Sequence, residues 1–192
     1  MVDKVQIDRD FRVFFRVLGT YEIDDEGLIH TQGDVDARED FPGPHLPVQF
    51  GVVQGDFNME VQDRLTDLQG SPHTLTGEFF VLANNLTTLT GAPTHVGARC
   101  VIRSNQLRSL EHLPLTVRVL RINISPTLPL LRLTERDYPI VWGYPTSMGG
   151  ASNPLLRTAT EIINKYMGTG KAGAIKAAAE LVRAGCKANA RW

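Results

Sequence analysis

Cysteine and long apolar runs are scarce in this sequence, and each scarcity excludes a class of protein. The 192 residues include two cysteines, Cys100 and Cys186, which lie far apart in the chain. A disulfide framework is therefore not expected, and a reducing compartment is the default. The longest uncharged apolar run is far shorter than the roughly 20 residues that cross a bilayer, and residues 1–10 carry too many charges for a signal peptide. We expect a soluble, cytoplasmic protein with no membrane partner.

The net charge is also low, at −1, but the charged residues are unevenly distributed. Residues 1–65 hold 6 Lys and Arg against 14 Asp and Glu, residues 66–153 hold 7 against 5, and residues 154–192 hold 7 against 2. Such an asymmetry can favour head-to-tail contact between copies or steer an oppositely charged partner. Two simply solvated ends are equally consistent with it.

Two sets of leucines and one set of prolines recur at a fixed spacing of 21 residues. They are Leu65, Leu86, Leu107 and Leu128; Leu68, Leu89, Leu110 and Leu131; and Pro72, Pro93 and Pro114. A period of about 20–29 residues is typical of a solenoid, in which each unit stacks on its neighbours because it cannot bury its apolar face alone. The spacing therefore predicts a solenoid.

A shorter motif within each repeat, Gly-acidic-apolar-x-apolar, predicts the strand of that repeat. It starts at Gly33, Gly55 and Gly77, which are 22 residues apart, and the apolar pairs at 100/102 and 120/122 continue it. Because side chains alternate between the two faces of a strand, each apolar pair points inward, and about five such strands stack into a parallel ladder. The predicted core positions in the clearest strands are Phe79, Val81, Cys100, Ile102, Leu120 and Ile122.

The alternate positions of these strands are predicted to face outward in two rows. The first row is Asn58, Phe80, Val101 and Arg121, and the second is Glu60, Leu82, Arg103 and Asn123. The central positions are apolar and the flanking ones are charged or polar, which is the composition of a protein interface. We therefore predict that this surface, here called the strand face, binds a protein partner. The alternative is that a terminal segment folds over its apolar side chains.

Asn84 and Asn105 follow two of the predicted strands at matching positions. A side-chain amide that faces inward there can hydrogen bond backbone groups of neighbouring coils that no regular ladder satisfies. We therefore expect amides at this position to connect successive coils.

The segments before the repeats are predicted to be a cap and two short strands. Apolar residues between Ile7 and Leu18 are spaced as on one face of a helix, which would run from Gln6 to Leu18 and cap the first coil within residues 1–20. A strand through residues 11–18 is the alternative. Two short strands are expected around residues 21–23 and 28–31, joined by an acidic turn.

After the solenoid, which is predicted to span residues 21–133, the composition changes to Pro, Gly, Tyr and Trp. This change predicts an irregular connector over residues 134–152. Asn153 and Pro154 then provide a helix start, and a second helix is expected from about Lys171 to Ala184, so that residues 153–192 form a helical hairpin. The expected apolar faces are Leu155, Ala159, Ile162, Ile163 and Tyr166 on the first helix, and Ile175, Ala178, Ala179 and Val182 on the second.

The repeat F-x-V-x-x-N-x-L-x-x-L-x-G-x-P, which starts at Phe79, resembles the short bacterial type of leucine-rich repeat. The stretches YEIDDEGLIHTQGDVD, LPVQFGVVQGDF and LTTLTGAPTHVGA, in that order, resemble leucine-rich-repeat proteins encoded by tailed bacteriophages, over about Tyr21–Leu131. The resemblance implies an α/β solenoid whose partner is a host protein or a phage assembly component, in the host cytoplasm or the virion. The sequence departs from the pattern at FPGP (41–44) and at Ser-Pro (125–126), so the repeat is expected to fray at both ends.

No catalytic motif accompanies these features. The stretch GTGK at 168–171 departs from a phosphate-binding loop, which needs Gly where Lys165 stands and Ser or Thr where Ala172 stands. His73 and His95 occupy matching turn positions and are expected to lie close together, but two histidines without a third ligand make a weak metal site. We therefore expect no enzyme activity, no cofactor and no metal.

Two other functions stay open. The C-terminal segment could bind nucleic acid with a steep salt dependence, although a net charge near zero speaks against it. The basic residues concerned are Arg157, Lys165, Lys171, Lys176, Lys187 and Arg191. Alternatively, the protein could be a virion or assembly component that forms a homo-oligomer through its charge asymmetry or its C-terminal helices.

Overall fold

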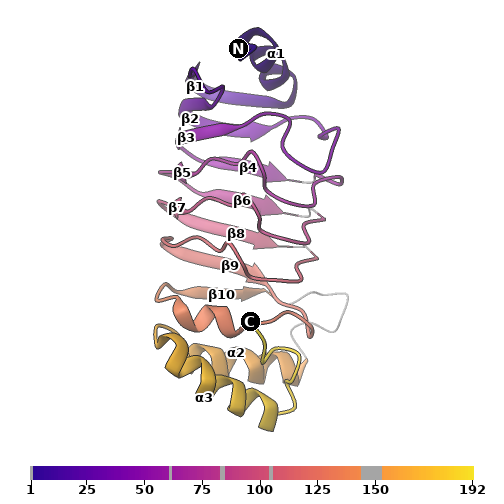
Figure 1. Ribbon diagram of the computed structural model, residues 1–192, viewed down its shortest axis with the longest axis vertical. Coiled ribbons are helices and arrows are strands. Elements are labelled where there is room, and N and C mark those ends of the chain that lie inside the picture. The colour runs from indigo at the N-terminus through magenta and orange to yellow at the C-terminus, as the bar shows by residue number, and fades with distance from the viewer. Residues whose placement is uncertain (1, 61, 83–84, 104–105, 144–152) are drawn as a thin grey trace.

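The computed structural model describes residues 2–60, 62–82, 85–103, 106–143 and 153–192, which form a solenoid with α1 at one end and α2 and α3 at the other (Figure 1). The elements in chain order are α1 (Lys4–Phe14), β1 (Phe15–Ile23), β2 (Ile29–Ala37), β3 (Phe50–Gln54), β4 (Phe57–Glu60), β5 (Thr74–Leu75), β6 (Phe79–Leu82), β7 (His95–Val96), β8 (Arg99–Arg103), β9 (Val119–Asn123), the 3-10 helix η1 (Leu131–Glu135), β10 (Ile140–Gly143), α2 (Pro154–Tyr166) and α3 (Gly170–Arg183). The predicted solenoid with a parallel strand ladder, an N-terminal helix and a C-terminal helical hairpin is confirmed. Within the described residues, no helix is both long enough and apolar enough to cross a membrane.

Two parallel ladders run along the solenoid and share β2. The longer ladder has the order β2-β4-β6-β8-β9-β10 and the shorter one the order β2-β3-β5-β7, while β1 pairs antiparallel with β2. In the longer ladder Phe57 lies beside Phe79, and Cys100 lies beside both Phe79 and Leu120. The shorter ladder was not predicted, because β5 and β7 are each only 2 residues long and show no alternating pattern.

Inward side chains of the longer ladder form a continuous buried column. The six predicted core positions are all buried, and they are Phe79, Val81, Cys100, Ile102, Leu120 and Ile122. At the N-terminal end of the column the ring centroid of Phe57 lies 4.8 Å from that of Phe50 and 6.0 Å from that of Phe79. Burial raises the pKa of the Cys100 thiol to about 12, so this thiol stays protonated at neutral pH and serves as a core side chain.

The glycine and acidic residue that begin the Gly-acidic-apolar-x-apolar motif join one coil to the next. Asp34 Oδ1 accepts a hydrogen bond of 2.8 Å from the backbone N–H of Asp56, and Asp56 Oδ1 accepts one of 2.7 Å from that of Glu78. A Cβ atom on Gly77 would lie 2.1 Å from Asp56 Oδ1 and 2.5 Å from the backbone of Gly55. The acidic side chain thus requires a glycine in the next coil, which explains why the two residues recur together.

Gln62 shows how a buried side-chain amide joins two coils. Its Oε1 accepts a hydrogen bond of 3.0 Å from the backbone N–H of Phe41, and its Nε2 donates one of 3.3 Å to the carbonyl oxygen of Glu39. Both contacts satisfy backbone groups that belong to no strand pair. The predicted roles of Asn84 and Asn105, at the corresponding positions of the following coils, lie outside the described residues.

The N-terminal segment combines the two structures that its sequence allows. The helix α1 ends at Phe14 and β1 begins at Phe15, so the helix prediction was too long and the strand alternative holds for the second half of the segment. Phe11 and Phe15 are buried, whereas Leu18 is 49% exposed. The strands β1 and β2 have 9 residues each and pair over their full length, so the two short strands predicted here are parts of one long hairpin. This pairing overrides the helical spacing because it hydrogen bonds the whole segment.

The segment predicted as an irregular connector contributes a sixth strand to the longer ladder. β10 pairs in parallel with β9, with Ile140 beside Leu120 and Trp142 beside Ile122. Ile140 and Trp142 therefore continue the inward columns of the preceding strands and pack against the core. The prediction missed this strand because the Pro and Gly residues around it indicate a loop.

The predicted packing face is largely correct for α2, where Ala159, Ile162 and Ile163 are buried, but wrong for α3. The buried residues are Leu156, Ala159, Thr160, Ile162 and Ile163 on α2, and Gly173, Ala174, Ala177 and Leu181 on α3. Leu155 is exposed, and so are Ile175 and Val182, at 73% and 46%. Small side chains at the buried positions allow α3 to approach α2 closely, which a search for large apolar residues does not detect.

The last residues of the chain return to the solenoid and bond to its last coil. Asn189 is buried, and its Nδ2 donates hydrogen bonds of 2.8 Å to the carbonyl oxygen of Leu128 and 3.4 Å to that of Ser125. The backbone N–H of Leu130 donates in turn to the carbonyl oxygen of Asn189, at 3.0 Å. No local pattern predicts this contact, because 61 residues separate Asn189 from Leu128.

Candidate functional site

The strand face is the outward surface of β4, β6, β8 and β9, and the two predicted rows run across it. The first row is Asn58, Phe80, Val101 and Arg121, and the second is Glu60, Leu82 and Arg103, followed by Asn123 at the end of β9. Phe80 and Leu82 are half-buried on β6, while Glu60 and Arg103 are exposed on the strands to either side. The parallel pairing of the strands therefore brings the apolar and charged residues of this surface together as expected from the register.

Val101 differs from the prediction, because only 1% of it is exposed. Its neighbours at the same register are Phe80 on β6 and Arg121 on β9, and Arg99 and Arg103 flank it on the same face of β8. Neighbouring strands lie only about 4.8 Å apart, so these longer side chains cover the shorter valine. The accessible apolar part of the strand face is therefore reduced to Phe80 and Leu82.

A third outward row, which the sequence prediction missed, borders the strand face. It consists of the acidic residues of the Gly-acidic motif, which are Asp34, Asp56 and Glu78, and it ends in Arg99. The guanidinium of Arg99 binds the carboxylate of Glu78 through Nε at 2.6 Å and through Nη2 at 2.9 Å. The carboxylate of Glu78 holds the pKa of the Arg99 guanidinium above its ordinary value. The same guanidinium lies 5.9 Å from the centroid of the Phe80 ring, so a bidentate ion pair fixes the position of a cation against the aromatic centre.

Charge changes sign along the strand face and the row and strand that border it. The acidic side chains lie on β2 and β4 and immediately before β4 and β6, and they are Asp34, Asp36, Asp56, Glu60 and Glu78. The basic side chains lie on β8 and β9, and they are Arg99, Arg103 and Arg121. Phe80 and Leu82 lie on β6, between the two groups. A partner that covers Phe80 and Leu82 would therefore meet a negative field on one side and a positive field on the other.

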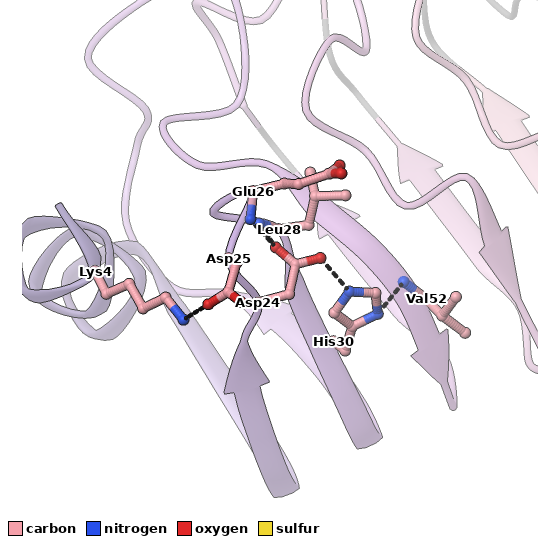
Figure 2. Close-up of polar contacts among 7 residues, drawn as sticks. All are labelled: Lys4, Asp24, Asp25, Glu26, Leu28, His30 and Val52. Atoms are coloured by element: carbon pink, nitrogen blue, oxygen red, sulfur yellow. Dashed lines mark hydrogen bonds and ion pairs between the residues drawn. The ribbon is translucent and has the colours of Figure 1, made fainter. Parts of the chain in front are cut away.

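A second polar cluster lies at the turn of the β1–β2 hairpin (Figure 2). Asp24 Oδ1 accepts hydrogen bonds from the backbone N–H groups of Glu26 at 2.9 Å and Leu28 at 2.8 Å, and Asp24 Oδ2 lies 3.0 Å from Nε2 of His30. The Nδ1 atom of His30 accepts from the backbone N–H of Val52 at 3.2 Å. These bonds, with that to His30 as the strongest, hold the pKa of the Asp24 carboxyl below its ordinary value. The acidic turn thus fixes the hairpin and connects it to β3.

We expect the Asp24→Asn variant to be less stable than the wild type at neutral pH, because the substitution removes the charge that accepts these bonds. A carboxyl whose pKa is lowered by folding stabilises the folded state above its unfolded pKa of about 3.9, and this contribution is lost as the pH falls. The difference in free energy of unfolding between the two proteins should therefore shrink below about pH 4. Urea denaturation at a series of pH values measures it.

Asp25→Asn is the matched control, because Asp25 is exposed and its only described contact is a surface ion pair of 2.8 Å with Lys4. Exposed ion pairs contribute little, so we expect almost no change in stability from this variant. A difference between Asp24→Asn and the wild type that does not vary with pH would contradict the assigned role of the Asp24 carboxylate.

A pocket of about 320 Å³ lies beside this cluster, on the outward side of β1, β2 and β3. Its lining is polar and consists of Thr20, Tyr21, Glu22, His30, Thr31, Gln32, Val52 and Gln54. Both ring nitrogens of His30 already have partners, so the imidazole is not available as a base while those bonds hold. The pocket can offer hydrogen bonds to a ligand.

His73 and His95 lie close together, as predicted, with their ring centroids 6.2 Å apart. Each ring bonds a threonine hydroxyl of the following coil, with His73 Nε2 at 3.1 Å from Thr94 Oγ1 and His95 Nδ1 at 2.9 Å from Thr116 Oγ1. Within the described ranges, no three His, Cys, Asp or Glu residues come together as a metal-binding group. The two histidines instead join coils along one edge of the solenoid.

The predicted basic residues of the C-terminal segment have different surroundings. Lys165 Nζ pairs with Glu180 at 2.9 Å, and Arg191 donates to the carbonyl oxygens of Thr127 at 3.1 Å and Ala188 at 3.0 Å. Arg157, Lys171, Lys176 and Lys187 are exposed. Two of the six residues therefore stabilise the helical hairpin and the returning tail, which weakens the case for a basic binding patch.

No protein-family model, curated protein or solved structure matches this chain. The functional assignment therefore rests on the geometry of the strand face, which joins an apolar centre to charged flanks of opposite sign on a regular ladder.

Proposed function

We propose that the protein is a non-catalytic interaction module that binds a protein partner through the strand face. The observation that carries this proposal is the position of Phe80 and Leu82. Both are large apolar side chains on the solvent side of a strand that is paired on both edges, and an apolar centre with a charged rim is the usual composition of a protein interface. The ladder fixes the backbone of both residues before binding, so little backbone conformational entropy is lost on association.

The charges of the strand face define the partner by its chemistry. Glu60 on one side and Arg103 on the other favour a partner with an apolar patch, a basic group toward β4 and an acidic group toward β8. The resemblance to phage-encoded leucine-rich-repeat proteins directs the search for this partner to host proteins first and to phage assembly components second. A phage-encoded binder of a host protein would act as an inhibitor of a host process or defence.

We expect the Phe80→Asp/Leu82→Asp double variant to fold and to lose the partner. Central interface residues commonly contribute at least 2 kcal/mol each, so the affinity should fall about 100-fold or more. Affinity capture from host lysate, followed by titration of the identified partner, measures this loss. Light scattering on the same samples reports any self-association.

Leu115→Asp/Ile175→Asp is the matched control, because it also replaces two exposed apolar residues with aspartate but lies outside the strand face. The control should bind as tightly as the wild type. Equal binding by all three proteins would place the partner site elsewhere and refute the proposal. Unfolding of the Phe80/Leu82 variant alone would show that these side chains belong to the core.

A further inference from the structure

β1 has one edge that pairs with no other strand in the part of the chain that the structure describes. The other edge bonds to β2, and at the two ends of this pairing the backbone N–H of Asp24 donates to Leu28 and that of Arg38 donates to Phe14. Hydrogen-bonded residues alternate along an antiparallel pair, and the residues between them direct N–H and C=O to the opposite edge. Val17, Gly19 and Tyr21 therefore direct these backbone groups to the free edge of β1.

The free edge of β1 is exposed in its middle, at residues 18–20, and its C-terminal half faces α1 across a groove. A groove of about 510 Å³ lies between β1 and α1, with residues 19–23 on one side and Lys4, Asp8 and Arg12 of α1 on the other. The middle of the strand is open to solvent, and Leu18 is 49% exposed. An exposed edge with unpaired backbone groups is a template for another strand.

The side chains of β1 identify that other strand as a second copy of β1. The sequence FRVLGTYEI contains two charged residues, Arg16 and Glu22, which stand three positions to either side of Gly19. When two copies pair antiparallel about Gly19, Arg16 of each lies opposite Glu22 of the other, and Leu18 lies opposite Thr20. The same register pairs odd-numbered residues with odd-numbered residues, so the unpaired backbone groups bond one another.

Both charged residues are available for this contact. Arg16 and Glu22 are exposed, and neither forms an ion pair within the described residues. Opposite charges on directly opposed residues stabilise an antiparallel pair, and like charges destabilise it. Symmetry gives each dimer two such pairs, so the pattern in one strand favours pairing with its own copy over pairing with an arbitrary strand.

We propose that two copies of the chain associate through β1 to form a symmetric dimer with one continuous sheet. The contact is isologous, because the same strand contributes to both sides. It removes the exposed strand edge and brings the two Leu18 side chains within diagonal reach. It does not involve the strand face and therefore stands apart from the proposed partner binding. One strand edge is a small interface, so we expect a reversible, concentration-dependent dimer.

Charge reversal tests the register. Arg16→Glu and Glu22→Arg each place like charges opposite one another at two positions of the dimer. Each variant should therefore raise the dimer dissociation constant about tenfold or more. The double variant Arg16→Glu/Glu22→Arg restores both pairs and should dimerise like the wild type. An equal mixture of the two single variants should form a mixed dimer, because each supplies the charge that the other needs. Sedimentation velocity over a range of concentrations measures all four cases.

Amide hydrogen exchange provides a second measurement on the wild type. The amides of Val17, Gly19 and Tyr21 should exchange fast in dilute protein and slowly at concentrations where the dimer forms. Because Arg16 also lies opposite Asp36 on β2, folding of the Arg16 variant is checked by thermal melting. If the Arg16 variant does not fold, Leu18→Lys replaces it as the variant expected to disrupt the dimer. Leu18 is exposed, and a lysine on an edge strand opposes pairing with another strand.

Three results would overturn the proposal. The first is a wild-type protein that stays monomeric up to about 1 mM, which would leave the edge free for an extended segment of another protein. The second is a dimer that survives both charge reversals and Leu18→Lys. The third is a dimer that is lost in the single variants and is recovered neither in the double variant nor in the mixture.

Discussion

Replacing Phe79 with alanine should lower the free energy of unfolding by about 3–5 kcal/mol, because the substitution leaves a cavity that the surrounding side chains fill only in part. Phe79 is fully buried, and its ring stacks against that of Phe57 with centroids 6.0 Å apart. The residues on its two sides in the ladder, Phe57 and Cys100, are held by strand pairing and cannot move into the space. Urea denaturation followed by circular dichroism measures the loss.

Phe80→Ala is the matched control, because it changes the next residue of the same strand in the same way. The Phe80 ring is half-buried on the outward side and contacts the Arg99 guanidinium rather than the core. Its removal should cost about 1 kcal/mol, since only part of the apolar area of the side chain leaves water on folding. Equal losses in the two variants would mean that β6 does not alternate as described, because a shift of one residue exchanges the two faces of a strand.

Gly77→Ala should lower the free energy of unfolding by roughly 1–3 kcal/mol, the usual cost of forcing an extra methyl group into a packed site. Its new Cβ would lie 2.1 Å from Asp56 Oδ1 and 2.5 Å from the backbone of Gly55. Either the coil spacing must increase or Asp56 must give up its hydrogen bond to the N–H of Glu78. Thermal and urea unfolding measure the effect.

Gly43→Ala provides the comparison for this prediction. A Cβ at Gly43 meets no atom within 4 Å, so the alanine needs no rearrangement, and it restricts the unfolded chain. We expect the Gly43 variant to match the wild type or to gain about 0.4–1 kcal/mol. If Gly77→Ala behaved in the same way, the close packing of successive coils at the Gly-acidic motif would be refuted.

The sequence was informative where a structural requirement repeats. The spacing of the leucines predicted the coil length, and the alternation within Phe79–Val81 and Cys100–Ile102 predicted which side chains are buried. Every coil buries side chains at equivalent positions, so the same residue pattern recurs in the sequence and can be recognised by its period. The clustering of the strand-face residues followed from the same register.

The ends of the chain were harder to predict because their structure depends on contacts distant in sequence. β1 takes its nine-residue length from pairing with β2, although its first residues are spaced as in a helix. α3 buries alanine and glycine in place of Ile175 and Val182, and Asn189 bonds a carbonyl oxygen 61 residues earlier in the chain. None of these contacts leaves a period in the local sequence.

The candidate site was predicted in its positions but only partly in its accessibility. Alternation places Phe80 and Val101 outward alike, but the exposure of each depends on the length of the side chains beside it. Val101 lies among longer neighbours and is covered, whereas Phe80 remains partly open. The contribution of Arg99 was missed because its ion pair with Glu78 joins two coils, and the sequence pattern of either coil alone does not show it.

The repeated coil also makes the length of the molecule adjustable by genetic duplication. Each coil bonds its neighbours through parallel strand pairing and adds about one strand spacing, roughly 4.8 Å, to the long axis. A tandem duplication of one coil would therefore move the β1 edge and the C-terminal helices apart by that amount without altering the residues at either end. The distance between the two ends of the molecule can therefore change in discrete increments while the residues at each end stay the same.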